Sequence, residues 1–117
     1  MDIVTGINIS LALISIALGI FGWLAPRYTM STIDLRDGGS TMGMSEVRAA
    51  SGALYVLAGI GALALNTPDA YAMIGFIWAG GAIGRLTSLM LDGQSRKKWV
   101  FLICETIIGM LGLGLNL

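Results

Sequence analysis

The chain has 117 residues, of which 56% are hydrophobic and only 12% are charged, and its mean hydropathy is +0.81. Soluble domains carry about 25% charged residues, so this composition indicates one domain that lies in a lipid bilayer. Seven basic and seven acidic side chains give a net charge of zero, which leaves no basic face for nucleic acid. Histidine is absent from the sequence, which excludes a histidine base and a histidine metal ligand.

The first apolar run, residues 3–25, is long enough to cross the hydrocarbon core, for which about 20 residues suffice. Asp2 stands where a secretory signal peptide carries Lys or Arg, and Pro26 follows the run directly. We therefore expect a membrane helix rather than a cleaved signal peptide. Small and polar side chains recur along one side of this predicted helix, at Asn8, Ala12, Ser15, Gly19 and Gly22.

Residues 26–46 form the longest polar stretch, yet its Leu, Ile and Met content predicts a segment that lies on the membrane surface. The hydroxyl of Thr41 or Ser45 is expected to cap the helix that follows. The three methionines of this stretch could act as soft copper ligands. Flexible packing at the interface is the better interpretation, because no second cluster of soft ligands exists. We expect no metal site and no cofactor.

Three more membrane helices are predicted from further apolar runs, at residues 47–65, 70–91 and 99–116. A tight turn at 66–69 precedes the third helix, and Asp69 favours the start of that helix. A short basic turn at 92–98 precedes the fourth helix. Residues 1–117 are therefore predicted to form a single all-α domain, a bundle of four transmembrane helices.

The basic side chains outside the apolar runs, or at their very start, all fall on one side of this four-span arrangement. They are Arg27, Arg36, Arg48, Arg96, Lys97 and Lys98. The side that holds both termini has no Lys or Arg. By the positive-inside rule, the two basic loops are cytoplasmic and both termini face the non-cytoplasmic side. We expect a multi-pass protein of the bacterial inner membrane.

Two charged residues interrupt the predicted membrane helices. Arg85 lies six residues before Leu91, and Glu105 lies six residues after Trp99, so each is about 9 Å inside its helix at 1.5 Å per residue. The short turn between these helices makes them antiparallel neighbours. Each residue alone costs roughly 2.5–3.5 kcal/mol inside a membrane helix. Arg85 and Glu105 are therefore predicted to form an ion pair.

Three more charged residues, Glu46, Arg48 and Asp92, lie at the same ends of the predicted helices, and Ser88 lies one turn from Arg85. With the predicted pair they form a charge cluster that has two interpretations. A structural cluster fixes the register between helices. A functional cluster lines a pocket that is open to the cytoplasm and binds an anion, a lipid head group or a proton. The sequence leaves both open.

Catalysis is not expected from these residues, so we predict no catalytic residue and no enzyme. Cys104 is adjacent to Glu105 but turned about 100° away from it on a helix. Ser88 is better placed to hydrogen-bond a neighbouring helix than to act as a nucleophile. The glycines within the apolar runs indicate close helix packing, and the predicted packing positions are Gly52, Gly59, Gly81, Gly84, Gly109 and Gly112.

The sequence resembles a family of small bacterial membrane proteins that is known only as a domain of unknown function. The resemblance rests on Glu46-x-Arg48-Ala49 with Gly52, on Gly84-Arg85-x-x-Ser88-x-x-x-Asp92-Gly93, and on Glu105 in the last run. It implies a four-helix inner-membrane protein and no activity. Small multidrug transporters share the length and the four-span plan. This chain departs from them because its first run lacks a glutamate and its loop charges are strongly biased.

The leading hypothesis is a non-enzymatic membrane protein whose charged pocket binds an anionic ligand or a lipid head group. Arg85 and Arg48 would bind the ligand, and Glu46, Asp92 and Glu105 would orient them. One alternative is an accessory subunit of a larger respiratory or photosynthetic membrane complex. Another is a small proton-coupled transporter in which Glu105 titrates. The expected partners are membrane lipids, with a membrane-protein complex or a second copy of the chain as further possibilities, and no nucleic acid.

Overall fold

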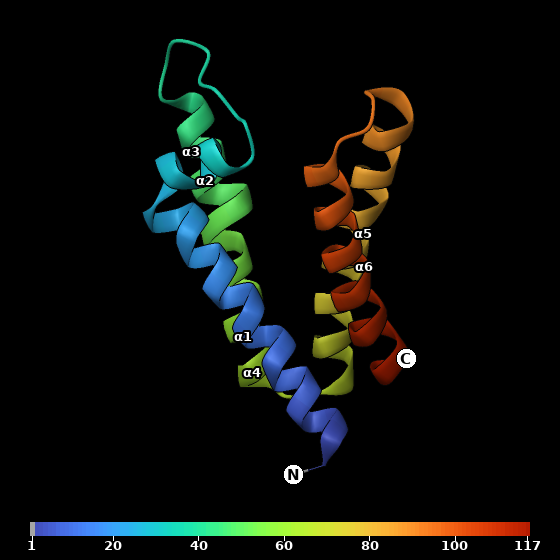
Figure 1. Ribbon diagram of the computed structural model, residues 1–117. Helices are drawn as coiled ribbons and strands as arrows, with labels where there is room; N and C mark the ends of the chain where they lie inside the picture. The colour runs from blue at the N-terminus through green and yellow to red at the C-terminus, as the bar shows by residue number, and fades with distance from the viewer. Residues whose placement is uncertain (1) are drawn as a thin grey trace. The chain divides into compact units, whose positions relative to one another are not determined.

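The computed structural model of the chain describes residues 2–117, and these residues form helices joined by short linkers (Figure 1). In chain order the elements are α1 (Ile3–Leu24), α2 (Pro26–Thr32), α3 (Met42–Arg48), the π-helical turn η1 (Ala49–Ala53), α4 (Leu54–Leu65), α5 (Pro68–Leu91) and α6 (Arg96–Asn116).

Four helical spans are long and apolar enough to cross a membrane. They are Ile3–Leu24, Met42–Leu65, Pro68–Leu91 and Arg96–Asn116. The second of these spans joins α3, η1 and α4 into one continuous helix. The predicted all-α class and the predicted four spans are confirmed, and they define a multi-pass membrane protein.

Helix boundaries differ from the sequence prediction because the prediction placed each start at the first apolar residue. The second span begins at Met42 rather than 47, so its first turns are polar. The fourth begins at Arg96 rather than 99, and the hydroxyl of Ser95 accepts a hydrogen bond from the Lys98 N–H at 3.2 Å. A capping hydroxyl outside the apolar run thus sets the start. The third begins at Pro68, in the first helical turn that suits proline.

The expected cap of the second span by Thr41 or Ser45 is wrong. Thr41 occupies the N-cap position, but its side chain makes no capping hydrogen bond. The Ser40 hydroxyl instead accepts from the Met42 N–H at 3.2 Å. The surface segment predicted at 26–46 also contains a helix of its own, α2, which begins with Pro26 directly after the α1 helix ends.

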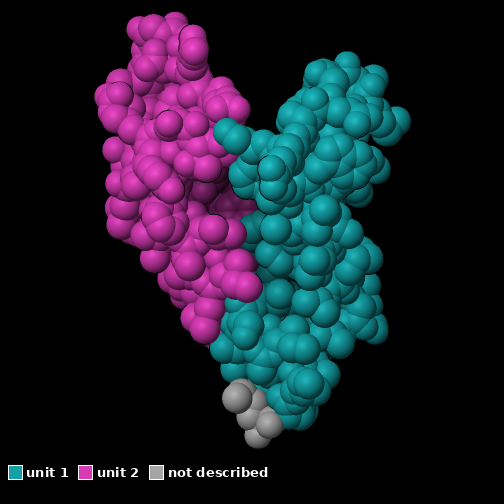
Figure 2. All heavy atoms as spheres, in the orientation of Figure 1, with its two compact units in different colours: residues 1–11, 65–117 teal, residues 12–64 magenta. Residues whose placement is uncertain are grey.

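The structure divides into two compact units, which Figure 2 distinguishes by colour. The α5–α6 unit comprises Leu65–Leu117 together with the start of the chain up to Leu11. The α1–α4 unit comprises Ala12–Ala64, which includes the rest of α1 and all of α2, α3 and η1, with nearly all of α4.

Glycines bring helix backbones together in the α5–α6 unit. A Cβ atom added to Gly75 of α5 would lie 3.0 Å from the Cα of Gly112 of α6, and one added to Gly109 would lie 2.8 Å from the Ala79 backbone nitrogen. Such distances leave no room for a side chain. α5 and α6 are thus antiparallel neighbours whose crossing needs glycine, as expected for helices that pack in lipid.

Glycines also bring the helix backbones together in the α1–α4 unit. A Cβ atom added to Gly52 would lie 2.8 Å from the Gly22 carbonyl carbon, and one added to Gly59 would lie 2.6 Å from the Ala12 carbonyl oxygen. Gly52 lies within η1, so the π-helical turn coincides with the closest approach to α1. Turns of this kind are rare inside α-helices and often mark functional or packing sites.

Two of the six predicted packing glycines have other surroundings. Gly81 faces a side chain, because a Cβ atom there would lie 2.9 Å from Oε2 of Glu105. Gly84 is exposed, and a Cβ atom there would meet no atom of its unit within 4 Å. The prediction that Gly84 packs against a helix is therefore wrong within the α5–α6 unit. Gly75, which is not among the predicted positions, takes part in the crossing instead.

An amide pair joins the start of α1 to the end of α6 inside the α5–α6 unit. The side-chain amides of Asn8 and Asn116 donate to each other's oxygens, and both bonds are 2.8 Å long. The Asn116 amide also donates to the Gly112 carbonyl at 2.8 Å. Asn8 is buried, so the reciprocal pair satisfies polar groups that would otherwise face an apolar surrounding.

Candidate functional site

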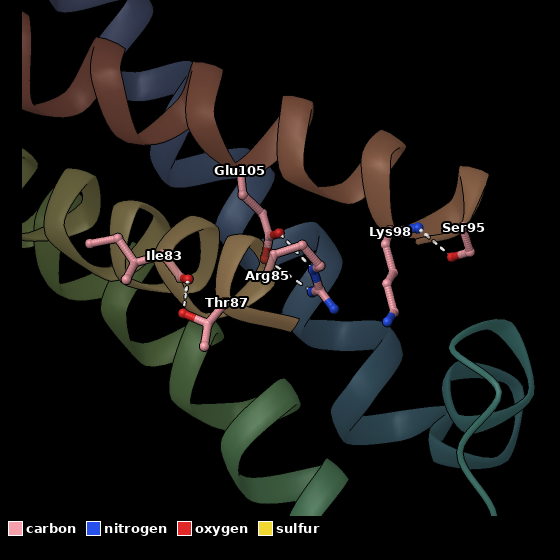
Figure 3. A network of polar contacts seen from close by, with 6 residues as sticks. All are labelled: Ile83, Arg85, Thr87, Ser95, Lys98 and Glu105. Atoms are coloured by element: carbon pink, nitrogen blue, oxygen red, sulfur yellow. Dashed lines mark hydrogen bonds and ion pairs between the residues drawn. The ribbon is translucent and has the colours of Figure 1, made fainter. Parts of the chain in front are cut away.

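Arg85 of α5 and Glu105 of α6 form the ion pair that the sequence predicts (Figure 3). Arg85 Nε donates to Glu105 Oε1 at 3.0 Å, and Nη2 donates to Oε2 at 3.2 Å. The planar guanidinium therefore binds the carboxylate through two parallel hydrogen bonds. This bidentate geometry is the strong form of an Arg–carboxylate contact and fixes the orientation of both groups.

The two partners lie at different distances from the turn that joins their helices. Arg85 is six residues, or about 9 Å, before the end of α5. Glu105 is nine residues, or about 13.5 Å, after the start of α6 at Arg96. The guanidinium lies on the Lys98 side of the Glu105 carboxylate (Figure 3). The charged end of Arg85 is thus directed toward the helix ends, as expected of a snorkelling side chain.

Burial differs across the pair. The Glu105 side chain is 11% exposed, whereas the Arg85 side chain is 37% exposed. Gly81 gives the carboxylate its space, since a Cβ atom at that position would lie 2.9 Å from Oε2. The carboxylate is therefore enclosed by the hairpin, and the guanidinium forms the accessible part of the pair.

An aromatic ring completes the surroundings of Arg85. Its guanidinium carbon lies 5.2 Å from the centre of the Phe101 ring, within the range of a cation–π contact. Phe101 precedes Glu105 by four residues, so both side chains project from the same face of α6. Sequence reasoning did not select Phe101, although this four-residue spacing from the glutamate is the signal that identifies it.

Part of the Arg85 guanidinium has no partner within the described chain. Nε and Nη2 each use a hydrogen for Glu105, and no residue among 2–117 accepts from Nη1. Arginine carries five N–H donors and no acceptor, so it requires further oxygen atoms to be satisfied. A phosphate or carboxylate oxygen, or water, is a suitable acceptor at this accessible edge.

Arg48 has a different partner from the one expected of a charge cluster. Its Nη1 donates to the carbonyl oxygen of Trp23 at 2.7 Å. Trp23 lies in the last turn of α1, where carbonyls lack donors from the helix itself. The guanidinium thus caps the C-terminal end of α1, where a positive charge is favourable.

The remaining residues of the predicted cluster lie at helix ends or on helix surfaces. Glu46 is exposed on α3 and forms no ion pair within residues 2–117. Asp92 is exposed, and its N–H donates to the Ser88 carbonyl at 2.8 Å as the helix α5 ends. Among the cluster residues of the α5–α6 unit, the side chains that the structure joins are those of Arg85 and Glu105. A pocket formed by all the cluster residues stays a prediction.

Metal-ligating side chains do not gather in the part of the chain that the structure describes. No group of three or more Cys, Asp or Glu side chains that could hold a metal ion exists within residues 2–117. The Cys104 thiol is free and exposed on α6. The side chains that come together in the α5–α6 unit are the ion pair and the aromatic ring beside it.

A helical multi-pass membrane protein with one bidentate ion pair between neighbouring spans is the class that this architecture defines. The chain belongs to the family described as Domain of unknown function (DUF4345), whose model matches residues 3–115. No curated protein and no solved structure matches the chain. The match extends over all four spans, so the resemblance inferred from the sequence is confirmed at the level of the family. The quoted motifs and a bacterial origin stay predictions.

Proposed function

We propose that this protein is a non-enzymatic membrane protein whose α5–α6 unit binds the phosphate of an anionic lipid head group through Arg85. The observation that carries the proposal is the asymmetry of the ion pair. The Glu105 side chain is 11% exposed and holds two of the guanidinium donors, whereas the Arg85 side chain is 37% exposed and its Nη1 has no acceptor among residues 2–117.

The position of Arg85 favours a lipid as the source of that acceptor. Arg85 lies about 9 Å before the end of α5, and its guanidinium is directed toward that end, within reach of a head group. Arg–phosphate contacts use the same fork geometry as Arg–carboxylate contacts, so a phosphate oxygen suits Nη1. Glu105 neutralises the site and orients the guanidinium.

Binding rather than reaction is the chemistry that this arrangement supports. The Glu105 carboxylate already accepts two hydrogen bonds from Arg85, so it is engaged in positioning and is not offered as a base. A fixed positive group beside a neutralising carboxylate can select an anion without changing it.

The experiment measures how many molecules of phosphatidylglycerol remain bound to the full-length chain in neutral detergent, by native mass spectrometry. The test variant is Arg85→Leu combined with Glu105→Leu, which removes both charges together and so leaves no unpaired group. Thr87→Val is the matched control, because the Thr87 hydroxyl only bonds its own helix at the Ile83 carbonyl. We expect the double variant to stay folded and to bind one lipid fewer than the Thr87→Val control. An unchanged lipid count in the folded double variant would leave the pair with a structural role only.

We further propose that both termini face the non-cytoplasmic side of a bacterial inner membrane. The support is the distribution of the six loop Lys and Arg residues, all on the side opposite the termini. A cysteine scan tests it, after exposed Cys104 has been replaced by Ala. A thiol reagent that cannot cross the membrane should label Leu117→Cys in intact cells and label Ser40→Cys only after the cells are broken. The reverse pattern contradicts the proposed orientation.

A second candidate function is that of an accessory subunit in a larger membrane complex. Gly80 and Gly84 of α5 favour it, because they are four residues apart, are exposed, and would carry a Cβ atom without meeting any atom of their unit within 4 Å. Small residues at this spacing let another helix approach closely. Native mass spectrometry after mild extraction separates the candidates, since a stoichiometric partner protein that Gly84→Ile releases favours the subunit.

A further inference from the structure

A hollow lies in the α1–α4 unit, between α2, the loop after it and the start of α3. Its volume is about 370 Å³. The polar part of its lining consists of Arg27, Ser31, Arg36 and Asp37. This hollow is in the other unit from Arg85, so a ligand bound in it is independent of the function proposed for the α5–α6 unit.

Local chain geometry brings the two arginines of this hollow together. Arg27 lies in the first turn of α2, and Arg36 lies in the loop beyond the end of that helix. Asp34 has a φ of 60°, and the Leu35 N–H donates to the Met30 carbonyl at 2.8 Å. This left-handed residue and the bond after it turn the loop back over α2, which places Arg36 beside the helix that carries Arg27.

Neither arginine is neutralised by the described chain. The side chains of Arg27 and Arg36 form no ion pair and no hydrogen bond with any residue among 2–117. Asp37 lines the same hollow, but its Oδ1 accepts from the Gly39 N–H at 3.3 Å and the carboxylate pairs with neither guanidinium. Two positive groups and one negative group leave the hollow with a net positive charge, which an anion would balance.

The rest of the lining is apolar. Met30 is buried at 6% exposure, and Leu35 and Met44 complete this side of the hollow. α2 begins directly after the first membrane span, so the hollow lies where that span ends. Basic pockets beside membrane helices bind phosphate-bearing head groups, and an apolar wall suits the chains attached to such a group.

We propose that the hollow formed by Arg27, Ser31 and Arg36 is a binding site for a phosphate group, supplied by an anionic phospholipid. The two guanidinium groups would each donate hydrogen bonds to phosphate oxygens, and the Ser31 hydroxyl would donate one more. Met30 and Leu35 would contact the adjoining glycerol and acyl carbons. An inorganic phosphate ion has the same charged group without those carbons, so the two sources can be distinguished.

The experiment titrates the full-length chain in neutral detergent with short-chain phosphatidylglycerol and counts bound lipids by native mass spectrometry. It compares Arg27→Gln and Arg36→Gln with Arg96→Gln. Arg96 is an exposed arginine of the other unit, and its replacement removes the same single charge. We expect each of the first two variants to weaken one binding step by about tenfold or more, as for loss of a charge-assisted hydrogen bond. Arg96→Gln should leave that step within about twofold. Circular dichroism confirms that each variant retains its helices.

Two outcomes overturn the proposal. Equal weakening in all three variants would mean that net charge alone attracts the lipid. Unchanged binding in Arg27→Gln and Arg36→Gln would mean that the hollow takes no phosphate group. A parallel titration with inorganic phosphate distinguishes the source, because displacement of the lipid by millimolar phosphate supports the phosphate site and contradicts the lipid as its occupant. The Arg85→Leu/Glu105→Leu variant should keep this binding step. The proposal for the hollow and the proposal for Arg85 are therefore tested independently.

Discussion

Arg85 in the α5–α6 unit and Arg48 in the α1–α4 unit are held in different ways. Arg85 binds a glutamate side chain through two hydrogen bonds. Arg48 donates to a backbone carbonyl, that of Trp23. The neighbouring helix accounts for the difference. α6 continues without a break past Glu105, so its carbonyls are occupied, whereas α1 ends near Trp23 and leaves carbonyls without donors.

The contrast shows that the end of a neighbouring helix can supply a carbonyl acceptor for an arginine, as it does for Arg48. Where the neighbouring helix continues, as beside Arg85, an acidic side chain takes that role. A helix interior has no spare acceptors, so the α5–α6 unit carries a second charged residue, the buried Glu105. Pro26 starts a new helix directly after α1, and the interruption supplies an acceptor without a second charge. The two units otherwise pack alike, since both rely on glycines at their helix crossings.

Removing the acidic partner should have the largest effect. Glu105→Leu leaves Arg85 without its counter-ion inside the span, and we expect it to lower the free energy of unfolding by about 3 kcal/mol. Arg85→Leu added to it should restore most of the loss. Unfolding by a denaturing detergent, followed by circular dichroism, measures both. A loss below about 0.5 kcal/mol for Glu105→Leu contradicts a need for the acidic partner.

Adding a methyl group at the helix crossings tests whether both units depend on glycine for close helix packing. A Cβ atom at Gly112 would lie 2.6 Å from the Gly75 Cα, and one at Gly52 would lie 2.8 Å from the Gly22 carbonyl carbon. Gly112→Ala and Gly52→Ala should each cost about 1–3 kcal/mol, as overpacking does.

The matched controls for the crossings lie on the same helices, at positions where a Cβ atom meets nothing within 4 Å. They are Gly114→Ala on α6 and Gly61→Ala on α4. Each should be neutral or stabilising by up to about 1 kcal/mol, because alanine favours a helix over glycine. Thermal unfolding in detergent ranks the four variants. Similar costs at crossing and control positions would show that the close approaches do not limit stability.

Replacing Arg48 tests the cap of α1. Arg48→Gln removes the positive charge that Arg48 places beside the Trp23 carbonyl. We expect it to lower the free energy of unfolding by only about 1 kcal/mol, since Arg48 is exposed. Arg48→Lys should keep most of that stability, because one donor suffices for one carbonyl. Arg85→Lys should not rescue its site, because lysine lacks the fork that binds both carboxylate oxygens. If Arg48→Lys and Arg85→Lys change the free energy of unfolding equally in the same assay, the two arginines are not held in different ways.

The reciprocal amide pair contributes a smaller amount. Asn8→Ala and Asn116→Ala, alone and combined, form a double-mutant cycle whose interaction energy we expect near about 0.6 kcal/mol, typical of hydrogen bonds inside membranes. Detergent unfolding supplies the four stabilities. Additive losses would mean that the two amides do not support each other.

The start of α1 gives the smallest effect, and it depends on pH. The Thr5 N–H donates to the Asp2 carboxylate at 2.8 Å, and this bond lowers the pKa of Asp2 below its ordinary value. The charged form is favoured in the fold, so its stabilisation is present above the ordinary pKa and is lost as pH falls through the lowered one. NMR titration of the carboxyl carbon measures the shift. Asp2→Asn should remove this acid dependence, and a pKa at or above the ordinary value contradicts the cap.

Much of the architecture could be predicted from residue types in order along the chain. Apolar runs identify the four spans, because the length of a run is compared with the fixed thickness of the hydrocarbon core. Arg85 and Glu105 were predicted as a pair from their distances to the intervening turn, although Glu105 proved one turn deeper in its helix than that count indicated. The pair still forms because the arginine side chain is long enough to span this offset along the helix axis.

The features that sequence reasoning missed depend on backbone groups. The Trp23 carbonyl that binds Arg48 is chemically the same as every other carbonyl in the chain, and only its place at a helix end makes it an acceptor. The η1 turn and the polar first turns of α3 also lack a pattern of apolar residues that would indicate them. Gly84 meets no neighbour within its own unit, and spacing alone does not tell which face of a helix meets another helix of the same chain.

The sequence by itself determined that the chain is helical, how many times it can span a membrane, and that an arginine and a glutamate within the spans must be paired. These properties come from hydropathy and charge, which each residue carries regardless of its neighbours. Only the tertiary structure decided which acceptor each arginine binds and which donors of a guanidinium have no acceptor. Those outcomes depend on the register between helices, which the close glycine contacts of each unit constrain.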